Sequence, residues 1–182
     1  MAQGTLLMDE KAMQRAITRI SHEITERNDG ADRVVLVGIK RRGVPLAKAI
    51  AAALEQIEGI KIPVGEVDIT HFRDDRGNKT TETMLTAANF PFKLEDSICV
   101  LVDDVLFTGR TARAAMEALM KAGRPAKVQL AVMVDRGHRE LPIRADFVGK
   151  NIPTAKSERI NVLVEEFDGE NCVMLTKTKN GD

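Results

Sequence analysis

Residues 97–120 constrain the fold of this chain most, because they join a strand, two acids, a short polar turn and a helix in that order. Ser97 to Val102 is a nearly continuous apolar run of strand length, typical of a strand covered on both faces in a parallel sheet. Asp103 and Asp104 follow it, and the apolar residues of segment 112–120 recur at helical spacing. The run predicts a β-strand, turn and α-helix unit of an α/β protein, with both acids at the carboxyl end of the strand.

The turn and the acids together favour a phosphorylated sugar as ligand. Free backbone N–H groups at the start of the helix, helped by the threonine hydroxyls, suit a phosphate dianion. Ionised aspartates only accept hydrogen bonds, so Asp103 and Asp104 suit the hydroxyl groups of the sugar. An isolated pair of acids at a strand end is usually an ordinary loop feature, and the complete run carries the argument here. The predicted ligand-binding residues of this turn are Val105, Leu106, Phe107, Thr108, Gly109, Arg110 and Thr111.

The same run resembles the phosphoribosyl pyrophosphate signature of the type I phosphoribosyltransferases. This resemblance implies a mostly parallel α/β sheet flanked by helices, with a small hood. It also implies that Asp103 and Asp104, the predicted catalytic residues, contact the ribose hydroxyls while the turn wraps the sugar phosphate. A length of 182 residues, 43 % of them hydrophobic, fits a single phosphoribosyltransferase domain over residues 1–182.

The remaining pattern alternates strands with helices, as expected for a parallel sheet covered on both sides. Asp9 is predicted to cap the first helix, and residues 72–89, which are polar and without clear period, are predicted to be a mobile loop or hairpin. The other predicted helices and strands are a helix over 9–28, a strand over 34–39, a helix over 44–57 and strands over 64–70, 127–134, 146–150, 159–166 and 172–177.

Composition excludes several classes of protein. Positive and negative side chains balance at 27 each, so a nucleic-acid function must depend on a local patch. There is no apolar run long enough to span a membrane and the start lacks a signal-peptide pattern, so we expect a cytoplasmic protein. Cys99 and Cys172 fit reduced core thiols, and the three histidines show no metal-binding spacing.

A second turn, residues 38–43, directly follows the predicted strand over 34–39. Taken alone, its three consecutive cations are most simply a solvated basic turn. Because ligands of such sheets bind beyond the carboxyl ends of the strands, the fold is expected to place this turn beside the acids. In type I phosphoribosyltransferases a loop here binds the leaving pyrophosphate, which implies that role for Lys40, Arg41, Arg42 and Gly43. Arg73 is a further candidate contact, with ordinary loop charge as the alternative.

The implied reaction displaces pyrophosphate from the anomeric carbon through a ribosyl cation-like state. Cations and Mg²⁺ on the pyrophosphate neutralise the departing charge. We expect the Mg²⁺ to be held mainly through the pyrophosphate, with Asp103 as an additional candidate ligand, and not by protein side chains alone.

Residues 134–154 resemble a segment typical of the bifunctional pyrimidine-operon attenuation regulators that are also uracil phosphoribosyltransferases. Matches at 18–23 and 63–70 extend the similarity over most of the chain. The resemblance implies that the base is uracil and the product UMP, with Arg136 and the backbone near Ile160 on the nucleobase side. It further implies UMP-dependent binding of a pyrimidine-operon mRNA hairpin, and association into dimers or higher oligomers. Members of that family often have Thr at the position that Arg41 occupies in this chain.

The first helix carries Thr18, Arg19 and His22 on one face at helical spacing, a pattern that is usually just the solvated side of an amphipathic helix. The family resemblance instead assigns this face to RNA. Cations with few aromatic residues suit phosphate contacts to a structured hairpin. The implied RNA-binding residues are Thr18, Arg19, His22, His138, Arg139, Arg144 and Lys150.

Two alternatives remain open from the sequence. One is a purely metabolic purine phosphoribosyltransferase without RNA binding, which a comparison of uracil, hypoxanthine and guanine as substrates would reveal. The other is a regulator with a vestigial site, which the presence of both Asp103 and Asp104 disfavours.

Overall fold

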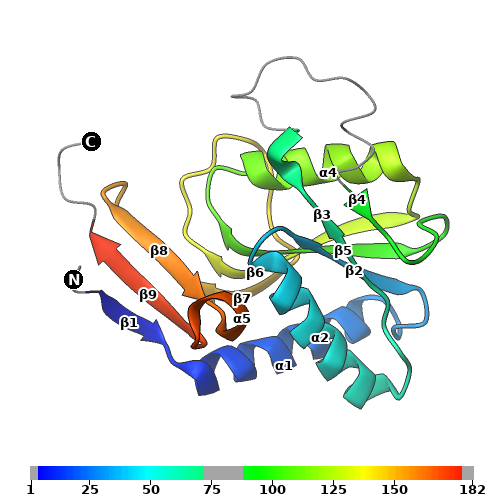
Figure 1. The fold of residues 1–182 in the computed structure, drawn as a ribbon, viewed down its shortest axis with the longest axis horizontal. Coiled ribbons are helices and arrows are strands. Elements are labelled where there is room, and N and C mark those ends of the chain that lie inside the picture. The colour runs from blue at the N-terminus through cyan, green and yellow to red at the C-terminus, as the bar shows by residue number, and fades with distance from the viewer. Residues whose placement is uncertain (1–3, 72–87, 178–182) are drawn as a thin grey trace.

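The computed structural model describes residues 4–71 and 88–177, and its centre is a six-stranded sheet in the order β4-β3-β2-β5-β6-β7 (Figure 1). Neighbouring strands from β3 to β7 pair in parallel, and only the short edge strand β4 is antiparallel. The strands are β2 (Val34–Ile39), β3 (Val64–Val67), β4 (Ala88–Asn89), β5 (Ile98–Leu106), β6 (Lys127–Asp135) and β7 (Phe147–Asn151). The predicted mostly parallel sheet is therefore confirmed.

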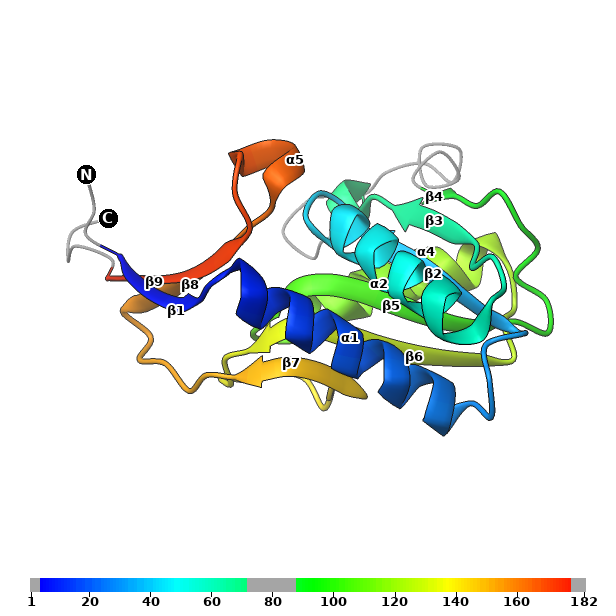
Figure 2. The same cartoon turned by 90° about the horizontal axis from the view of Figure 1, so that it is seen from below.

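Helices cover both faces of this sheet (Figure 2). α1 (Glu10–Arg27) and α2 (Gly43–Glu58) pack on one face, and α4 (Arg110–Ala122) packs on the other. Successive strand residues point to opposite faces, so Leu36 joins the core under α1 and α2 while Val37 joins the core under α4. This double burial explains why β2 is apolar and buried at every position.

The first helix begins where the sequence predicts. The Asp9 carboxylate accepts a hydrogen bond from the Ala12 backbone N–H at 2.7 Å, which satisfies one of the free donors of the first turn. Met13, Ile17 and Ile20 form the buried stripe of α1. No helix of the described residues is long and apolar enough to cross a membrane.

A second, antiparallel sheet of three strands lies at one end of the molecule and forms the small hood (Figure 1). Its order is β1-β9-β8, and the short helix α5 (Glu165–Asp168) connects β8 to β9. The sequence patterns predicted neither α5 nor β1. The hood strands are β1 (Thr5–Met8), β8 (Glu158–Leu163) and β9 (Cys172–Lys177).

Several predicted boundaries are wrong. The strand predicted over 159–166 ends at Leu163, and α5 begins at Glu165. β5 continues to Leu106 and includes both acids, because its ladder with β6 extends from Ile98 to the pair Leu106 and Asp135. The strand predicted over 64–70 ends at Val67, and a 3₁₀ turn, η1 (Ile69–His71), follows it. Of segment 72–89, predicted to be a mobile loop or hairpin, the last two residues form β4, which pairs antiparallel with β3, and residues 72–87 lie outside the described residues.

Candidate active site

The two acids lie in the last part of β5, at the carboxyl edge of the sheet. Backbone N–H groups bind both carboxylates: the Asp104 N–H donates to Asp103 Oδ1 at 2.9 Å, and the Val105 N–H donates to Asp104 Oδ1 at 2.8 Å. Burial and the adjacent negative charge of Asp104 raise the pKa of Asp103 well above its usual 3.8. A cation or a hydroxyl donor at Asp103 would therefore be stabilising, as a sugar or metal site requires.

The turn after β5 leads directly into α4. Gly109 has a φ of 94°, a left-handed conformation that glycine adopts without steric cost, and Arg110 starts the helix. The Thr108 hydroxyl accepts from the Arg110 N–H at 3.3 Å. The start of α4 thus presents backbone donors just beyond the acids, which is the geometry predicted for the sugar phosphate.

The turn after β2 packs against the acid-bearing strand. A Cβ on Gly43 would lie 2.2 Å from the Val102 carbonyl oxygen, so only glycine allows α2 to begin this close to β5. Val102 immediately precedes Asp103 and pairs with Gly38 of β2. The two predicted turns are therefore brought together, with the acids between them.

The cations of the second turn already have partners in the protein. Lys40 Nζ lies 2.9 Å from Glu66 Oε1, and the Arg41 guanidinium stacks over the Phe167 ring at 4.8 Å from its centroid. Arg42 forms a bidentate ion pair with Asp168 of α5. These partners lie far along the chain, and the sequence patterns gave no signal for them.

The Arg42 and Asp168 pair joins the second turn to the hood. Nη2 of Arg42 lies 2.7 Å from Asp168 Oδ1, and Nε lies 3.2 Å from Oδ2. The guanidinium lowers the pKa of Asp168, and a hydrogen bond from the Val164 N–H acts in the same direction. A pyrophosphate bound at this turn must either use its backbone or draw Arg42 away from Asp168.

Arg136 is 7 % exposed and fastens the end of β6 to the connection between β7 and β8. Its guanidinium donates to Thr154 Oγ1, to the Ala155 carbonyl and to the Glu158 carbonyl at 2.9, 3.2 and 2.8 Å. The Phe107 ring stacks on it at 4.0 Å from the centroid. Burial lowers the pKa of Arg136, and Glu158 partly opposes this effect. Arg136, which is predicted to lie on the nucleobase side, thus links the turn after β5 to the segment that enters the hood.

Comparisons with known proteins decide the family. A model of the phosphoribosyl transferase domain matches residues 4–166. The Bifunctional protein PyrR of Geobacter sulfurreducens is 57 % identical over 177 residues, covering 97 % of this chain and 100 % of that protein. The Bifunctional protein PyrR of Bacillus subtilis is 54 % identical over 177 residues, covering 96 % and 98 %. The chain belongs to the PyrR family.

Solved structures show the same fold at low identity. A hypoxanthine phosphoribosyltransferase of Trypanosoma cruzi matches with a TM-score of 0.73 and 16 % identity over 98 % of both chains. One from Staphylococcus aureus matches with a TM-score of 0.64 and 18 % identity over 85 % of this chain and 79 % of that one. These likenesses support the fold alone, so they do not favour the purine alternative over PyrR membership.

The residues expected to bind RNA in a PyrR protein fall into two groups. In the first, Thr18, Arg19 and His22 lie on the exposed face of α1, and Arg19 donates to the Val148 and Gly149 carbonyls of β7. Lys150 of β7 is exposed too, and its Nζ donates to the hood at the Leu7 carbonyl. The expected helix face therefore exists and continues onto β7.

The second group lies in the connection between β6 and β7. Arg144 is exposed, whereas His138 is half-buried and its Nε2 contacts the Thr154 carbonyl oxygen. Arg139 is half-buried as well, and its guanidinium binds the protein itself. Ile160, the other residue expected near the base, is buried in β8, and Arg73 lies outside the described residues.

The acids fit a hard cation in part. Mg²⁺ prefers oxygen ligands in octahedral geometry and usually takes one or two carboxylates together with substrate phosphates. Asp103 and Asp104 offer such carboxylates, and the raised pKa of Asp103 marks a place where positive charge would be stabilising. Within residues 4–71 and 88–177 no three acids, histidines or cysteines cluster as metal ligands, so further ligands would come from the diphosphate.

Proposed function

We propose that this PyrR-family protein converts uracil and phosphoribosyl pyrophosphate to UMP and pyrophosphate, and that its UMP-bound form binds pyrimidine-operon mRNA to attenuate transcription. The observation that carries the proposal is the convergence of the acids, the start of α4 and the turn after β2 at one sheet edge, with Gly43 against Val102. Membership of the PyrR family supports uracil over a purine base.

Each part of the site then has one task. Asp103 and Asp104 accept hydrogen bonds from the ribose hydroxyls, and their charge favours the ribosyl cation-like state. The turn from Val105 to Thr111 holds the 5′-phosphate through its backbone donors. Mg²⁺ bound to the diphosphate would stabilise the leaving group as a Lewis acid.

The turn after β2 is proposed to hold the departing pyrophosphate. Gly43 leaves room for close approach, while Lys40, Arg41 and Arg42 supply positive charge within reach. Arg42 would exchange a carboxylate for a phosphate oxygen, two partners that a guanidinium binds in the same forked geometry. Arg73, which lies outside the described residues, is proposed as a further contact to the pyrophosphate.

The RNA-binding half of the proposal uses the exposed face of α1 with β7, and the connection between β6 and β7. Phosphate contacts from these cations would give affinity that falls with salt. We also propose that residues 1–182 act as one domain, in a homodimer or larger assembly in the cytoplasm.

The enzymatic half is tested by incubating the protein with phosphoribosyl pyrophosphate, Mg²⁺ and one of uracil, hypoxanthine or guanine. We expect UMP from uracil and far lower turnover of both purines. A preference for a purine would contradict the proposal, and absence of all turnover together with RNA binding would favour a vestigial site.

The role of the acids is tested with Asp104→Asn. The change keeps the size of the side chain and removes its charge, so turnover should fall about a hundredfold or more. Asp32→Asn, at an exposed position before β2, is the matched control and should keep wild-type kinetics. Unchanged turnover in Asp104→Asn would reject the sugar-binding role.

The regulatory half is tested by a gel-shift titration of the organism's own pyrimidine leader RNA. UMP should increase the affinity, because an effector acts through its differential affinity for RNA-competent states. RNA affinity that is independent of UMP would contradict this half.

A further inference from the structure

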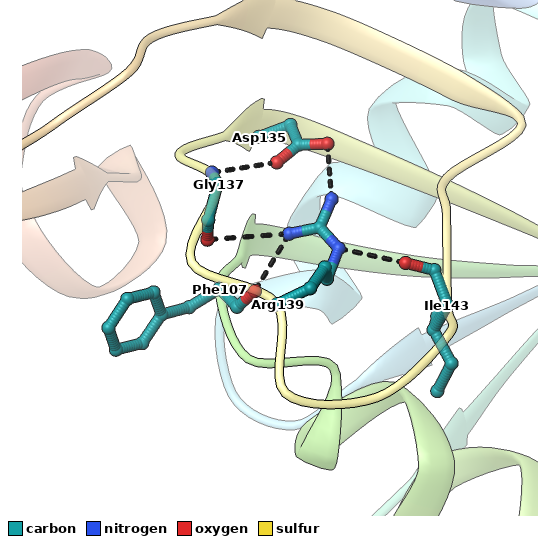
Figure 3. Close-up of polar contacts among 5 residues, drawn as sticks. All are labelled: Phe107, Asp135, Gly137, Arg139 and Ile143. Carbon is teal, nitrogen blue, oxygen red and sulfur yellow. Dashed lines mark hydrogen bonds and ion pairs between the residues drawn. The ribbon is translucent and has the colours of Figure 1, made fainter.

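The Arg139 guanidinium is enclosed by hydrogen-bond acceptors of its own chain (Figure 3). Its Nε donates to the Ile143 carbonyl at 2.8 Å, and its Nη1 donates to the Phe107 carbonyl at 2.7 Å and the Gly137 carbonyl at 3.5 Å. Its Nη2 lies 2.5 Å from Asp135 Oδ2, and the side chain is only 23 % exposed. The guanidinium thus binds four acceptors of its own chain, and we call this set of contacts the Arg139 brace.

The acceptors belong to two adjacent strand ends and the segment that follows one of them. Phe107 directly follows β5 and opens the phosphate-binding turn, while Asp135 ends β6, and the last residues of the two strands pair in register. The other oxygen of Asp135 accepts from the Gly137 N–H at 3.0 Å. Because lysine has no planar fork, only arginine can bind the turn carbonyl, the carboxylate and Ile143 together.

Further contacts join the same two segments. The backbone N–H groups of Glu140 and Leu141 donate to the Thr108 carbonyl at 2.9 and 3.2 Å. Arg110 Nε, at the start of α4, lies 3.1 Å from Glu140 Oε2. A shift of segment 136–143 would therefore move the carbonyl groups and side chains that shape the phosphate-binding turn.

The backbone of the segment is held in an uncommon conformation. Gly137 and His138 both have positive φ, 79° and 62°, and His138 is one of three non-glycine residues with positive φ among those described. For His138 a positive φ costs free energy that its surroundings must offset, and the contacts of the neighbouring Arg139 contribute to those surroundings. The contact between His138 and the Thr154 carbonyl then carries the constraint to the loop before the hood.

We propose that Arg139 is a positioning residue that couples the phosphate-binding turn to the RNA-binding face, and not a direct RNA contact. This inference rests on the proposed function and names how that site is regulated. A phosphate on the turn favours the arrangement in which the Phe107 carbonyl faces Arg139. The fork then fixes segment 136–144, which presents His138 and Arg144 to RNA. UMP and RNA therefore both stabilise the conformation in which the contacts of the Arg139 brace are formed.

The test compares Arg139→Gln and the milder Arg139→Lys with Arg124→Gln, an exposed position between α4 and β6 at the far edge of the sheet. Calorimetry should give a Kd for UMP raised about tenfold in both Arg139 variants, because Lys keeps the charge but loses the fork. The KM for phosphoribosyl pyrophosphate should rise by a similar factor, with a smaller change in kcat. Arg124→Gln should match the wild type.

RNA titrations with and without UMP separate positioning from contact. Both Arg139 variants should lose the increase in RNA affinity that UMP produces. Arg144→Gln, which removes an exposed cation from the same segment, should weaken RNA binding by the same factor with and without UMP. If Arg139→Lys keeps wild-type UMP and RNA affinities, Arg139 acts as a point charge and the inference is overturned.

Failure of this inference is distinguishable from failure of the proposed function. A wild-type protein that makes no UMP contradicts the enzymatic proposal, but the UMP Kd of the Arg139 variants still tests the brace. A wild-type protein that makes UMP, with an unchanged Kd for UMP in Arg139→Gln, overturns the brace and leaves the enzymatic proposal standing.

Discussion

Gly43→Ala should impair the site from a position where two backbone segments touch. The new Cβ would lie 2.2 Å from the Val102 carbonyl oxygen, whereas ordinary contacts of this kind begin at 3.4 Å. The start of α2 and strand β5 must therefore separate by about 1.2 Å. Neither contacting atom can rotate away, because the Val102 carbonyl is part of the main chain and the new Cβ is bonded directly to the main chain of residue 43.

This separation has two expected consequences. Overpacking should lower the free energy of unfolding by about 1–3 kcal/mol. It also moves the turn after β2 away from the strand that carries Asp103, and a misplacement of about 1 Å between groups that position a substrate can reduce the rate about a hundredfold. We expect kcat/KM for phosphoribosyl pyrophosphate to fall by that order, while urea denaturation reports the stability change.

Gly59→Ala is the matched control because Gly59 ends the same helix. Its φ is 70° and no atom lies within 4 Å of a Cβ placed there. Alanine in this left-handed conformation should cost about 1 kcal/mol of stability without affecting the site. Wild-type kcat/KM in Gly43→Ala, or an equal loss in Gly59→Ala, would refute the reasoning.

Three other predictions concern charge and burial. Asp103→Asn should make the protein more stable than the wild type at pH 7, because the raised pKa of Asp103 means that wild-type stability falls as pH rises above 3.8. Urea denaturation should show this difference vanish in acid, and equal stability of the two proteins at pH 7 would contradict the prediction. Asp168→Asn should lower the free energy of unfolding by about 1 kcal/mol at pH 7, because Arg42 lowers the pKa of Asp168 and the ion pair stabilises the fold until pH falls through that pKa. An equal loss of stability at pH 2 and pH 7 would argue against the ion pair. Burial raises the pKa of Cys99 to about 12, so iodoacetamide at pH 8 should leave it unmodified in the folded protein, and rapid labelling would show that β5 opens.

The strand, acids, turn and helix of residues 97–120 could be predicted because each depends on neighbouring residues. Apolar continuity predicts the buried strand, and Gly109 permits the left-handed turn that starts α4. The length of β5 could not be read in the same way. Its last residues are held by pairing with β6, and that ladder depends on a segment far along the chain.

Long-range side-chain partners were beyond the sequence patterns as well. The turn after β2 was predicted to bind a ligand through its three cations, but its pattern does not reveal that Arg42 pairs with Asp168, which lies 126 residues later. The RNA contact expected of Arg139 is implied by the family resemblance. Its fork between Phe107 and Asp135 becomes visible only when β5 and β6 are side by side.

One site at the carboxyl edge of the sheet is proposed to bind a ribosylated diphosphate. A crystal structure with phosphoribosyl pyrophosphate and Mg²⁺ would show whether it does. The ribose hydroxyls should lie within hydrogen-bond distance of Asp103 and Asp104, and the 5′-phosphate should lie on the backbone N–H groups of residues 107–111. Density at any other place, or none at saturating ligand, would contradict the account.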